Sequence, residues 1–99
     1  MDLTGTYKGY TKLMDNTYDM NSFDIPIGIY HTEGSNNVPN HFPSSFYNAT
    51  IIIGKIRTND RFQILISYNS RSIAFRISHI EDGWSSIKWN KITTTQITV

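Results

Sequence analysis

The three histidines are the side chains best suited to metal binding or proton transfer. His31, His41 and His79 lie far apart in the sequence, and none belongs to an H-E-x-x-H motif or to another short ligand spacing. The chain has no cysteine, so no thiolate can complete a zinc site or act as a nucleophile. We therefore expect polar histidines in loops and at strand ends, with no metal and no cofactor.

Carboxylates near the N-terminus could supply oxygen ligands to calcium. Asp15, Asp19 and Asp24 lie close to Asn16 and Asn21. Their spacing does not match an EF-hand loop, which has glycine at position six and glutamate at position twelve. We expect these residues to be solvated turn residues.

A glycoside hydrolase would need two carboxyl groups that face each other at roughly 5 to 10 Å. The loop acids available for this are Glu33, Asp60, Glu81 and Asp82. Glu81 and Asp82 precede Gly83, where acidic residues are typical of a turn on structural grounds alone. No G-x-S-x-G, Walker or dinucleotide-binding motif is present. The sequence therefore predicts that the protein is not an enzyme, and a small glycan hydrolase remains an alternative.

Composition excludes several other classes of protein. The 99 residues carry a formal charge of +1, which gives little of the field that draws a protein to nucleic acid. No apolar stretch is long enough to span a bilayer, and the N-terminus does not resemble a signal peptide. We expect a soluble domain with no nucleic-acid partner and no membrane insertion. Abundant Ile, Tyr, Phe, Thr, Ser and Asn favour strands and turns over helices.

The second half of the chain predicts a meander of at least four strands. The segment 49–56 is a β-branched run expected to be covered on both faces, and the break at 58–60 leads into a strand at 62–68. After a short polar break, the alternation over 72–78 completes a hairpin. Turn residues at 81–83 then predict a further strand over 84–89.

Alternation also predicts which side chains share a face. Phe62, Ile64, Ile66 and Tyr68 fall on one face of their strand. In the next strand, Arg76 points away from the apolar face and is expected to be a solvated cation or a salt-bridge partner across the sheet. Trp84 and Trp89 fall on opposite faces of an ideal strand, so at most one of them is expected in a given core layer.

The first half is less regular. The segment 25–30 predicts a short extended piece that Pro26 confines to a strand start or a sheet edge. A long loop rich in turn-forming residues follows between His31 and Tyr47, and loops of this length are often functional. Residues 1–18 form an N-terminal segment of uncertain role, and residues 93–99 are expected to be a C-terminal tail or an edge strand.

An ordered set of short motifs over residues 19–92 resembles the knob domain of R-type pyocins and bacteriophage tail fibres. That family tends to read D-L-N, G-x-Y, N-x-P, an apolar strand, a Gln-bearing strand, an Arg-bearing strand and W-S-S-W-K. This chain shows the same order, with Met20 in place of the usual Leu and Ile87 in place of the second Trp. The matching segments are Asp19-Met20-Asn21, Gly28-Ile29-Tyr30, Asn37-Val38-Pro39, Ile51 to Ile53, Gln63, Arg76 and Gly83-Trp84-Ser85-Ser86 with Lys88.

The resemblance implies a mainly β domain, a small antiparallel sheet or sandwich with long loops and little helix. It implies a homotrimeric fibre that is assembled in the bacterial cytoplasm and becomes part of the virion, where it contacts other tail or baseplate proteins. The implied function is receptor binding, that is, attachment to a bacterial surface polysaccharide such as lipopolysaccharide or teichoic acid. A structural connector or trimerisation module of a baseplate or fibre is the main alternative.

The resemblance also guides the choice of site residues. Exposed aromatic rings beside polar groups suit sugars, which bind by stacking and hydrogen bonding. Because specificity in the family tends to lie in variable loops, the candidate ligand-binding residues are Asn36, Asn37, Asn40 and His41, with Tyr47 and Trp84 for stacking. The family-matched residues expected to hold the domain together are Gly28, Tyr30, Pro39, Gln63, Arg76 and Ser85.

Overall fold

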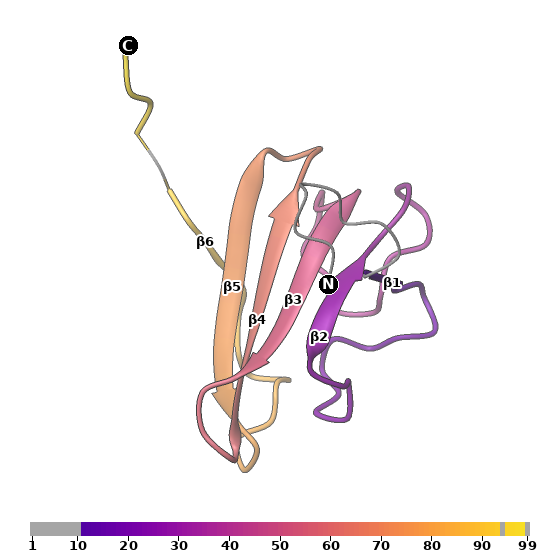
Figure 1. Cartoon of the computed structure of the whole chain (residues 1–99), viewed down its shortest axis with the longest axis vertical. Coiled ribbons are helices and arrows are strands. Elements are labelled where there is room, and N and C mark those ends of the chain that lie inside the picture. The colour runs from indigo at the N-terminus through magenta and orange to yellow at the C-terminus, as the bar shows by residue number, and fades with distance from the viewer. Residues whose placement is uncertain (1–10, 94, 99) are drawn as a thin grey trace, which may run out of the picture.

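The computed structural model describes residues 11–93 and 95–98, which form one six-stranded sheet and no helix (Figure 1). The strands are β1 (Lys12–Leu13), β2 (Gly28–His31), β3 (Ala49–Lys55), β4 (Asp60–Ser67), β5 (Ser72–His79) and β6 (Asn90–Lys91). Their order in the sheet is their order in the chain. The pair β1 and β2 is parallel and every other pair is antiparallel, so the sheet is mixed. The predicted mainly β class is confirmed, as a single sheet rather than a sandwich.

The three long central strands form where the sequence predicted them. β3 contains Thr50 and three consecutive isoleucines, whose branched side chains favour the extended backbone. The turn after β3 closes with a hydrogen bond from the amide of Asp60 to the carbonyl of Arg57. The turn after β4 places Arg71 at a φ of 51°, a left-handed conformation that is unusual for this residue type. Both hairpins are therefore set by short polar turns between apolar strands.

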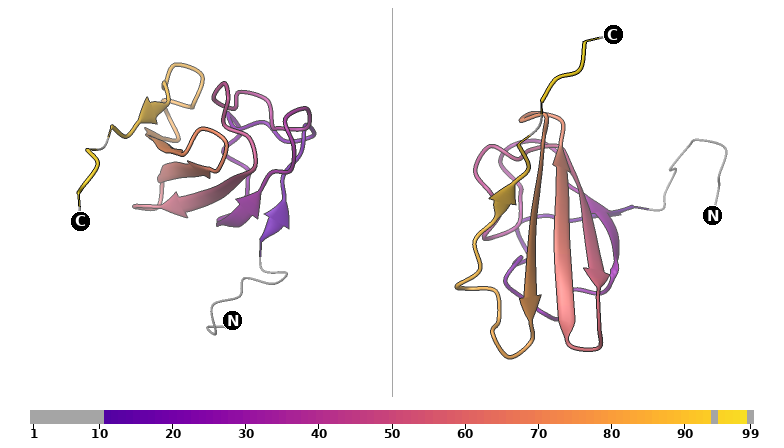
Figure 2. Two further views of the ribbon diagram at one scale, coloured as in Figure 1. Left: turned by 90° about the horizontal axis from the view of Figure 1, so that it is seen from above. Right: turned by 90° about the vertical axis from the view of Figure 1, so that its left-hand side faces the viewer.

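Within residues 11–93, the loops cover one side of the sheet. Seen from above, the strands lie along one side of the molecule and the loops gather on the other (Figure 2, left). The core lies between these two layers. Its loop residues include Met14, Met20, Ile25 and Phe46, and its sheet residues include Ile51, Ile53, Leu65 and Ala74.

The covered face of the sheet is the more polar one, which is the opposite of what the alternation suggested. Gln63 and Arg76 point into the core layer and are only 1% and 2% exposed. Ile66 and Ile77 lie on the uncovered face and are 45% and 51% exposed. The prediction that Arg76 is a solvated cation is therefore wrong. The physical reason is that the loops supply hydrogen-bond acceptors for the buried polar groups.

The segment 84–89 is not the strand that the sequence predicted. A hydrogen bond from the Ile87 amide to the Trp84 carbonyl, 3.0 Å long, closes a turn there, and only Asn90 and Lys91 pair with β5. Residues 93 and 95–98 form no strand in this chain. Residues 1–10 of the N-terminal segment lie outside the described residues. No helix in the described part of the chain could span a membrane.

Candidate functional site

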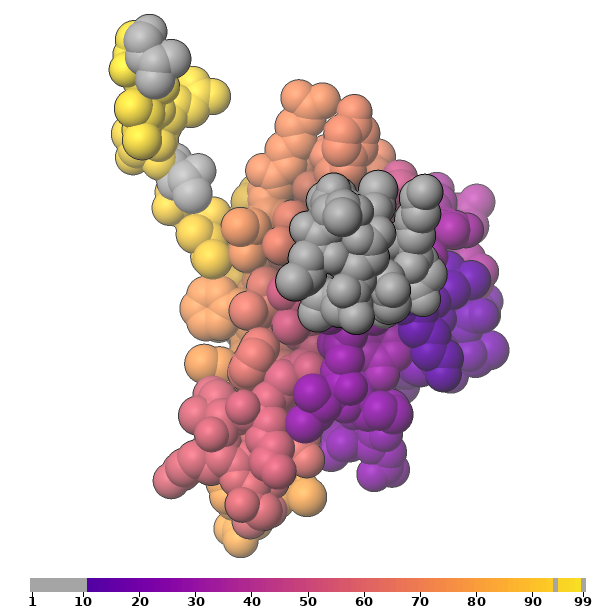
Figure 3. Space-filling view, viewed as in Figure 1, coloured from indigo at the N-terminus to yellow at the C-terminus, as the bar shows by residue number. Residues whose placement is uncertain are grey.

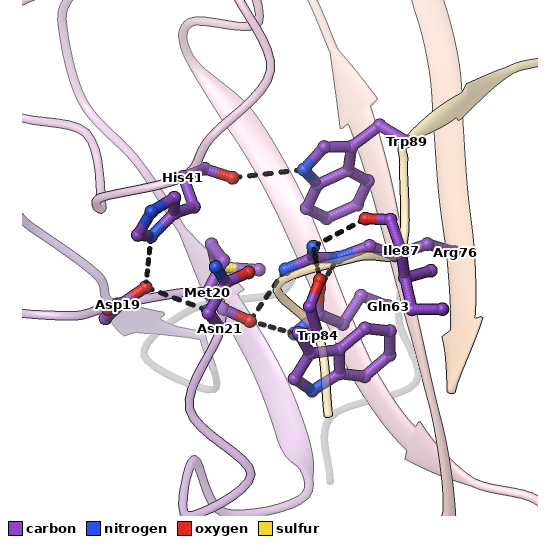
Figure 4. Close-up of polar contacts among 9 residues, drawn as sticks. All are labelled: Asp19, Met20, Asn21, His41, Gln63, Arg76, Trp84, Ile87 and Trp89. Carbon is purple, nitrogen blue, oxygen red and sulfur yellow. Dashed lines mark hydrogen bonds and ion pairs between the residues drawn. The ribbon is translucent and has the colours of Figure 1, made fainter. Parts of the chain in front are cut away.

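Arg76 is the centre of a hydrogen-bonded cluster on the covered face of the sheet (Figure 4). Its Nε donates to Oε1 of Gln63, the residue opposite it on β4, over 2.6 Å. Its Nη2 donates to the Met20 carbonyl over 2.8 Å, and Gln63 Nε2 donates to that same carbonyl over 2.8 Å. Its Nη1 donates to the carbonyls of Trp84 and Ile87 over 3.4 and 3.2 Å. One side chain thus ties both the early and the late loops to the sheet.

The guanidinium group also lies between two indole rings. Its carbon is 4.5 Å from the ring centroid of Trp84 and 4.3 Å from that of Trp89, within the range of cation–π attraction. Phe23 stacks on Trp84 with 5.2 Å between ring centroids. Burial lowers the pKa of Arg76 to about 10, and the Asp19 carboxylate opposes part of this effect. The guanidinium group therefore stays protonated at neutral pH, with its positive charge against both rings.

Asp19 and His41 form a second polar pair beside the cluster. Asp19 Oδ1 accepts from the amide of Asn21 over 2.9 Å and lies 2.7 Å from His41 Nδ1. The amide hydrogen bond, helped by His41, lowers the pKa of Asp19 below its ordinary value. The carbonyl of His41 accepts from Trp89 Nε1 over 3.0 Å. These contacts attach the 32–48 loop to the Trp89 side of the arginine cluster.

A shallow groove of about 250 Å³ opens between the pair and the cluster. The residues that line it include Asn21, His41, Phe42, Ser85 and Trp89. Asn21 Oδ1 is shielded from solvent and accepts no hydrogen bond from the described residues. The groove thus offers an aromatic side chain, an imidazole and a hydroxyl, while the Asn21 oxygen lies behind its surface. These groups suit a polyol, which both donates hydrogen bonds and presents apolar C–H faces.

The structure brings together only two of the six candidate ligand residues. His41 and Trp84 line the groove. Asn36 is exposed on its loop, Asn37 Oδ1 accepts from the Asn16 amide over 3.3 Å, and Asn40 is held by backbone hydrogen bonds to Tyr18 and Met20.

Tyr47 does not line the groove, and Trp84 differs from the stacking role expected of it. Tyr47 is half-buried, and its carbonyl accepts from Ser67 Oγ over 2.9 Å. Trp84 is 2% exposed because Arg76 and Phe23 pack on its ring, so it offers no free face for a sugar. The expectation that Trp84 stacks on a ligand is corrected. Trp89, which is only partly buried, is the better aromatic candidate.

Sequence reasoning missed several residues of the groove, among them Asn21, Phe42 and Trp89. Asn21 was considered only as a calcium ligand and as part of a family-like segment, Phe42 as a loop residue, and Trp89 as a residue of a strand. One signal was available. An arginine facing the same side as Gln63 in adjacent predicted strands needs partners, and aromatic rings near the chain end could supply them.

The family-matched residues lie in structural positions. The Tyr30 hydroxyl donates to the Pro26 carbonyl over 2.6 Å, and a side chain at Gly28 would contact the Tyr30 ring. Pro39 is buried. Ser85 differs from these, because it is exposed and lines the groove.

The acids considered for hydrolysis do not face the groove. Glu33 lies 3.4 Å from His31 Nε2, and Asp60 lies against Arg57 and 3.9 Å from His79 Nε2. Glu81 and Asp82 are exposed in the turn before Gly83. Within residues 11–93 and 95–98, no group of three or more His, Asp or Glu side chains could hold a metal ion.

The comparisons with known proteins add no evidence for or against the resemblance. No protein-family model, no curated protein and no solved structure matches this chain. The function is therefore argued from the cluster, the groove and the surface of the sheet.

Proposed function

We propose that this chain is the receptor-binding knob of a phage tail fibre or pyocin-like particle. It attaches to a bacterial surface glycan and performs no catalysis. Three copies act together at the end of the fibre, beside other tail or baseplate proteins. In this proposal the virion carries the domain to the cell surface, and lipopolysaccharide or teichoic acid is the receptor.

The observation that carries the proposal is the meeting of the family-like segments at Arg76. The segment Asp19-Met20-Asn21 supplies the Met20 carbonyl. β4 and β5 supply Gln63 and Arg76, and the segment Trp84-Ser85-Ser86 supplies the Trp84 carbonyl and ring. The hydrogen bonds thus join the Met20 segment, which lies 43 residues or more upstream, to three segments that follow one another in the second half of the chain. Chance matches of short motifs would not be expected to share one cluster, so this convergence supports the resemblance.

The groove supports a glycan as the ligand. Its volume of about 250 Å³ is below the roughly 300–1,000 Å³ of pockets that enclose drug-sized ligands, and it suits a single sugar unit. A contact of this size is weak by itself. Three linked copies that bind a repeating polysaccharide raise the overall affinity through effective concentration, with no further contact needed in each groove.

A structural connector or trimerisation module is the second candidate, and a specific observation favours it. The uncovered face of the sheet is apolar, with Ile66 and Ile77 about half exposed, and such a face suits another protein rather than a glycan. A connector would bind its neighbours in the particle through this face and would leave the groove empty.

A binding assay separates the two candidates. The full chain would be incubated with lipopolysaccharides, with wall teichoic acids and with whole cell walls from a panel of bacteria, and the bound fraction measured. We expect binding to at least one envelope polymer, and at least a tenfold loss of affinity in the double variant His41→Ala, Ser85→Ala. Lys55→Ala, which changes an exposed residue outside the groove, is the matched control.

Two results would contradict the proposal. If no polymer retained the wild-type chain, the connector would be favoured. If binding were equal in the groove variant and in the control, the groove would not be the receptor site. Shortening of the polymer during incubation would instead revive the hydrolase alternative, and Glu33→Gln and Glu81→Gln would then be compared.

A further inference from the structure

The uncovered face of β3, β4 and β5 is a regular apolar grid. Strand pairing places one residue from each strand in each of three rows, and none of the nine residues is charged. Seven of the nine are isoleucine or phenylalanine. The rows are Thr50-Ile66-Ile73, Ile52-Ile64-Phe75 and Gly54-Phe62-Ile77.

This surface is open in the described structure. Ile66, Ile73 and Ile77 are 45%, 36% and 51% exposed, and Ile56 and Ile92 at its borders are 54% and 41% exposed. A shallow depression of about 440 Å³ on the face is lined by isoleucine and phenylalanine alone. In the space-filling view, atoms of β4 and β5, in salmon and orange, lie at the surface toward the viewer (Figure 3).

Gly54 makes one corner of the face flat. Phe62 lies opposite Gly54 on β4, and its ring covers the glycine. A β-carbon at position 54 would overlap this ring. The phenyl group therefore lies along the sheet instead of standing upright. A flat face without charge can be matched by a second face of the same kind, which is the condition for contact between identical chains.

The area is sufficient for such a contact. An isoleucine side chain offers roughly 130 Å² of apolar surface, so the five exposed isoleucines leave roughly 300 Å² uncovered in each copy. The half-buried Phe62, Ile64 and Phe75, together with Tyr68 at 70% exposure, bring this to the order of 500 Å². Two such faces would bury on the order of 1,000 Å², the area at which specific interfaces between proteins begin.

We propose that this face is the contact surface between copies of the chain, with Ile64 and Phe75 at its centre. The inference goes beyond the proposed function and does not use its three copies: two matched faces join chains in pairs, and the mass measured below gives the number of copies. The grid has one polar side chain, Thr50, and therefore has almost nothing with which to recognise a glycan or a nucleic acid. A second copy is the partner that is present in equal amount whenever the chain is synthesised, and it carries the same flat apolar surface.

The test is the mass of the full chain in solution, measured by sedimentation and light scattering at micromolar concentration. We expect the wild type to form a defined assembly and Ile66→Lys, Ile77→Lys to be a monomer with an unchanged circular dichroism spectrum. Both positions are about half exposed, so the lysines fit the isolated fold and disrupt only a contact between faces. Ile27→Lys, Ile80→Lys changes equally exposed isoleucines outside the grid and should keep the assembly.

Three results would overturn the inference. One is a monomeric wild type. If the outer face of that monomer were protected from hydrogen exchange, the face would be covered by another part of the same chain. Another is an assembly that survives the two lysines on the grid. The third is an assembly that both double variants disrupt equally. A wild type that assembles through this face and binds no envelope polymer would keep the inference and would contradict only the receptor-binding function.

Discussion

Gln63 and Arg76 lie opposite each other on β4 and β5, and a 2.6 Å hydrogen bond joins Arg76 Nε to Gln63 Oε1 beneath the loops. Both side chains also donate to the Met20 carbonyl. The pair therefore has two roles. The two side chains are hydrogen-bonded to each other, and together they hold the loop that contains Met20 against the sheet.

The first prediction concerns the guanidinium group of Arg76. Arg76→Lys should lower the free energy of unfolding by about 2–4 kcal/mol, since a lysine ammonium cannot reach four acceptors in different directions. Urea denaturation measures this change. Arg71→Lys is the control, because Arg71 is exposed and only lies over the ring of Tyr68. Equal stability of the two variants would contradict a structural role for Arg76.

A second prediction separates the two roles of Trp89. Trp89→Phe removes the hydrogen bond to the His41 carbonyl and keeps a ring beside Arg76, so it should cost about 1 kcal/mol. Trp89→Ala removes the ring as well and should cost about 3 kcal/mol or more. Thermal unfolding followed by circular dichroism gives both values. If phenylalanine cost as much as alanine, the hydrogen bond rather than the ring would be the dominant contact.

The third prediction tests the close approach of Phe62 to Gly54. Gly54→Ala should destabilise the domain by about 1–3 kcal/mol, because the new methyl group overlaps the ring and forces it to move. In the double variant with Phe62→Ala the overlap is gone, so Gly54→Ala should then cost far less. A double-mutant cycle measured in urea gives the coupling directly. Additive effects would mean that the ring is not held over Gly54.

The fourth prediction concerns pH and Asp19. Its pKa is lowered in the folded state, chiefly by the Asn21 amide, so its contribution to stability is present above the unfolded value near 3.8 and is lost as pH falls through the lower folded value. The stability difference between wild type and Asp19→Asn should therefore be larger at pH 6 than at pH 2.

The partner His41 provides a check on the same group. In His41→Ala, carboxyl NMR should report an Asp19 pKa closer to its ordinary value than in the wild type, because one of the interactions that lower it has been removed. An Asp19 pKa that is equal in the two proteins, or a stability difference that grows toward acid pH, would show that this carboxylate does not form the contacts described.

Local pattern was enough to predict the central sheet. The β-branched run at Ile51 to Ile53 and the polar breaks at 58–60 and 69–71 specify strands and tight turns without reference to the rest of the chain. The same reasoning failed for Trp84 to Trp89, where contacts with Arg76 outweigh the strand tendency of the segment.

The alternation of apolar and polar residues also could not say which face is covered. Burying the Ile64 and Phe75 face would satisfy the hydrophobic pattern equally well. The loops instead cover Gln63 and Arg76, because backbone carbonyls from loops satisfy these two polar groups. Met20, Gln63, Arg76 and Trp84, which the resemblance singled out, meet in the structure. The groove beside them depends on His41 and Trp89, which are brought together only when the loops fold.

The outermost strands of the sheet determine how the chain can associate. β1 and β6 are two residues long, and each carries an exposed lysine, Lys12 and Lys91. Short, charged edges offer few free backbone groups to a neighbouring strand, so they discourage the open-ended growth that leads to fibrils. The chain can therefore associate with a few partners through the apolar face of β3, β4 and β5. Its short, charged edge strands disfavour polymerisation by strand addition.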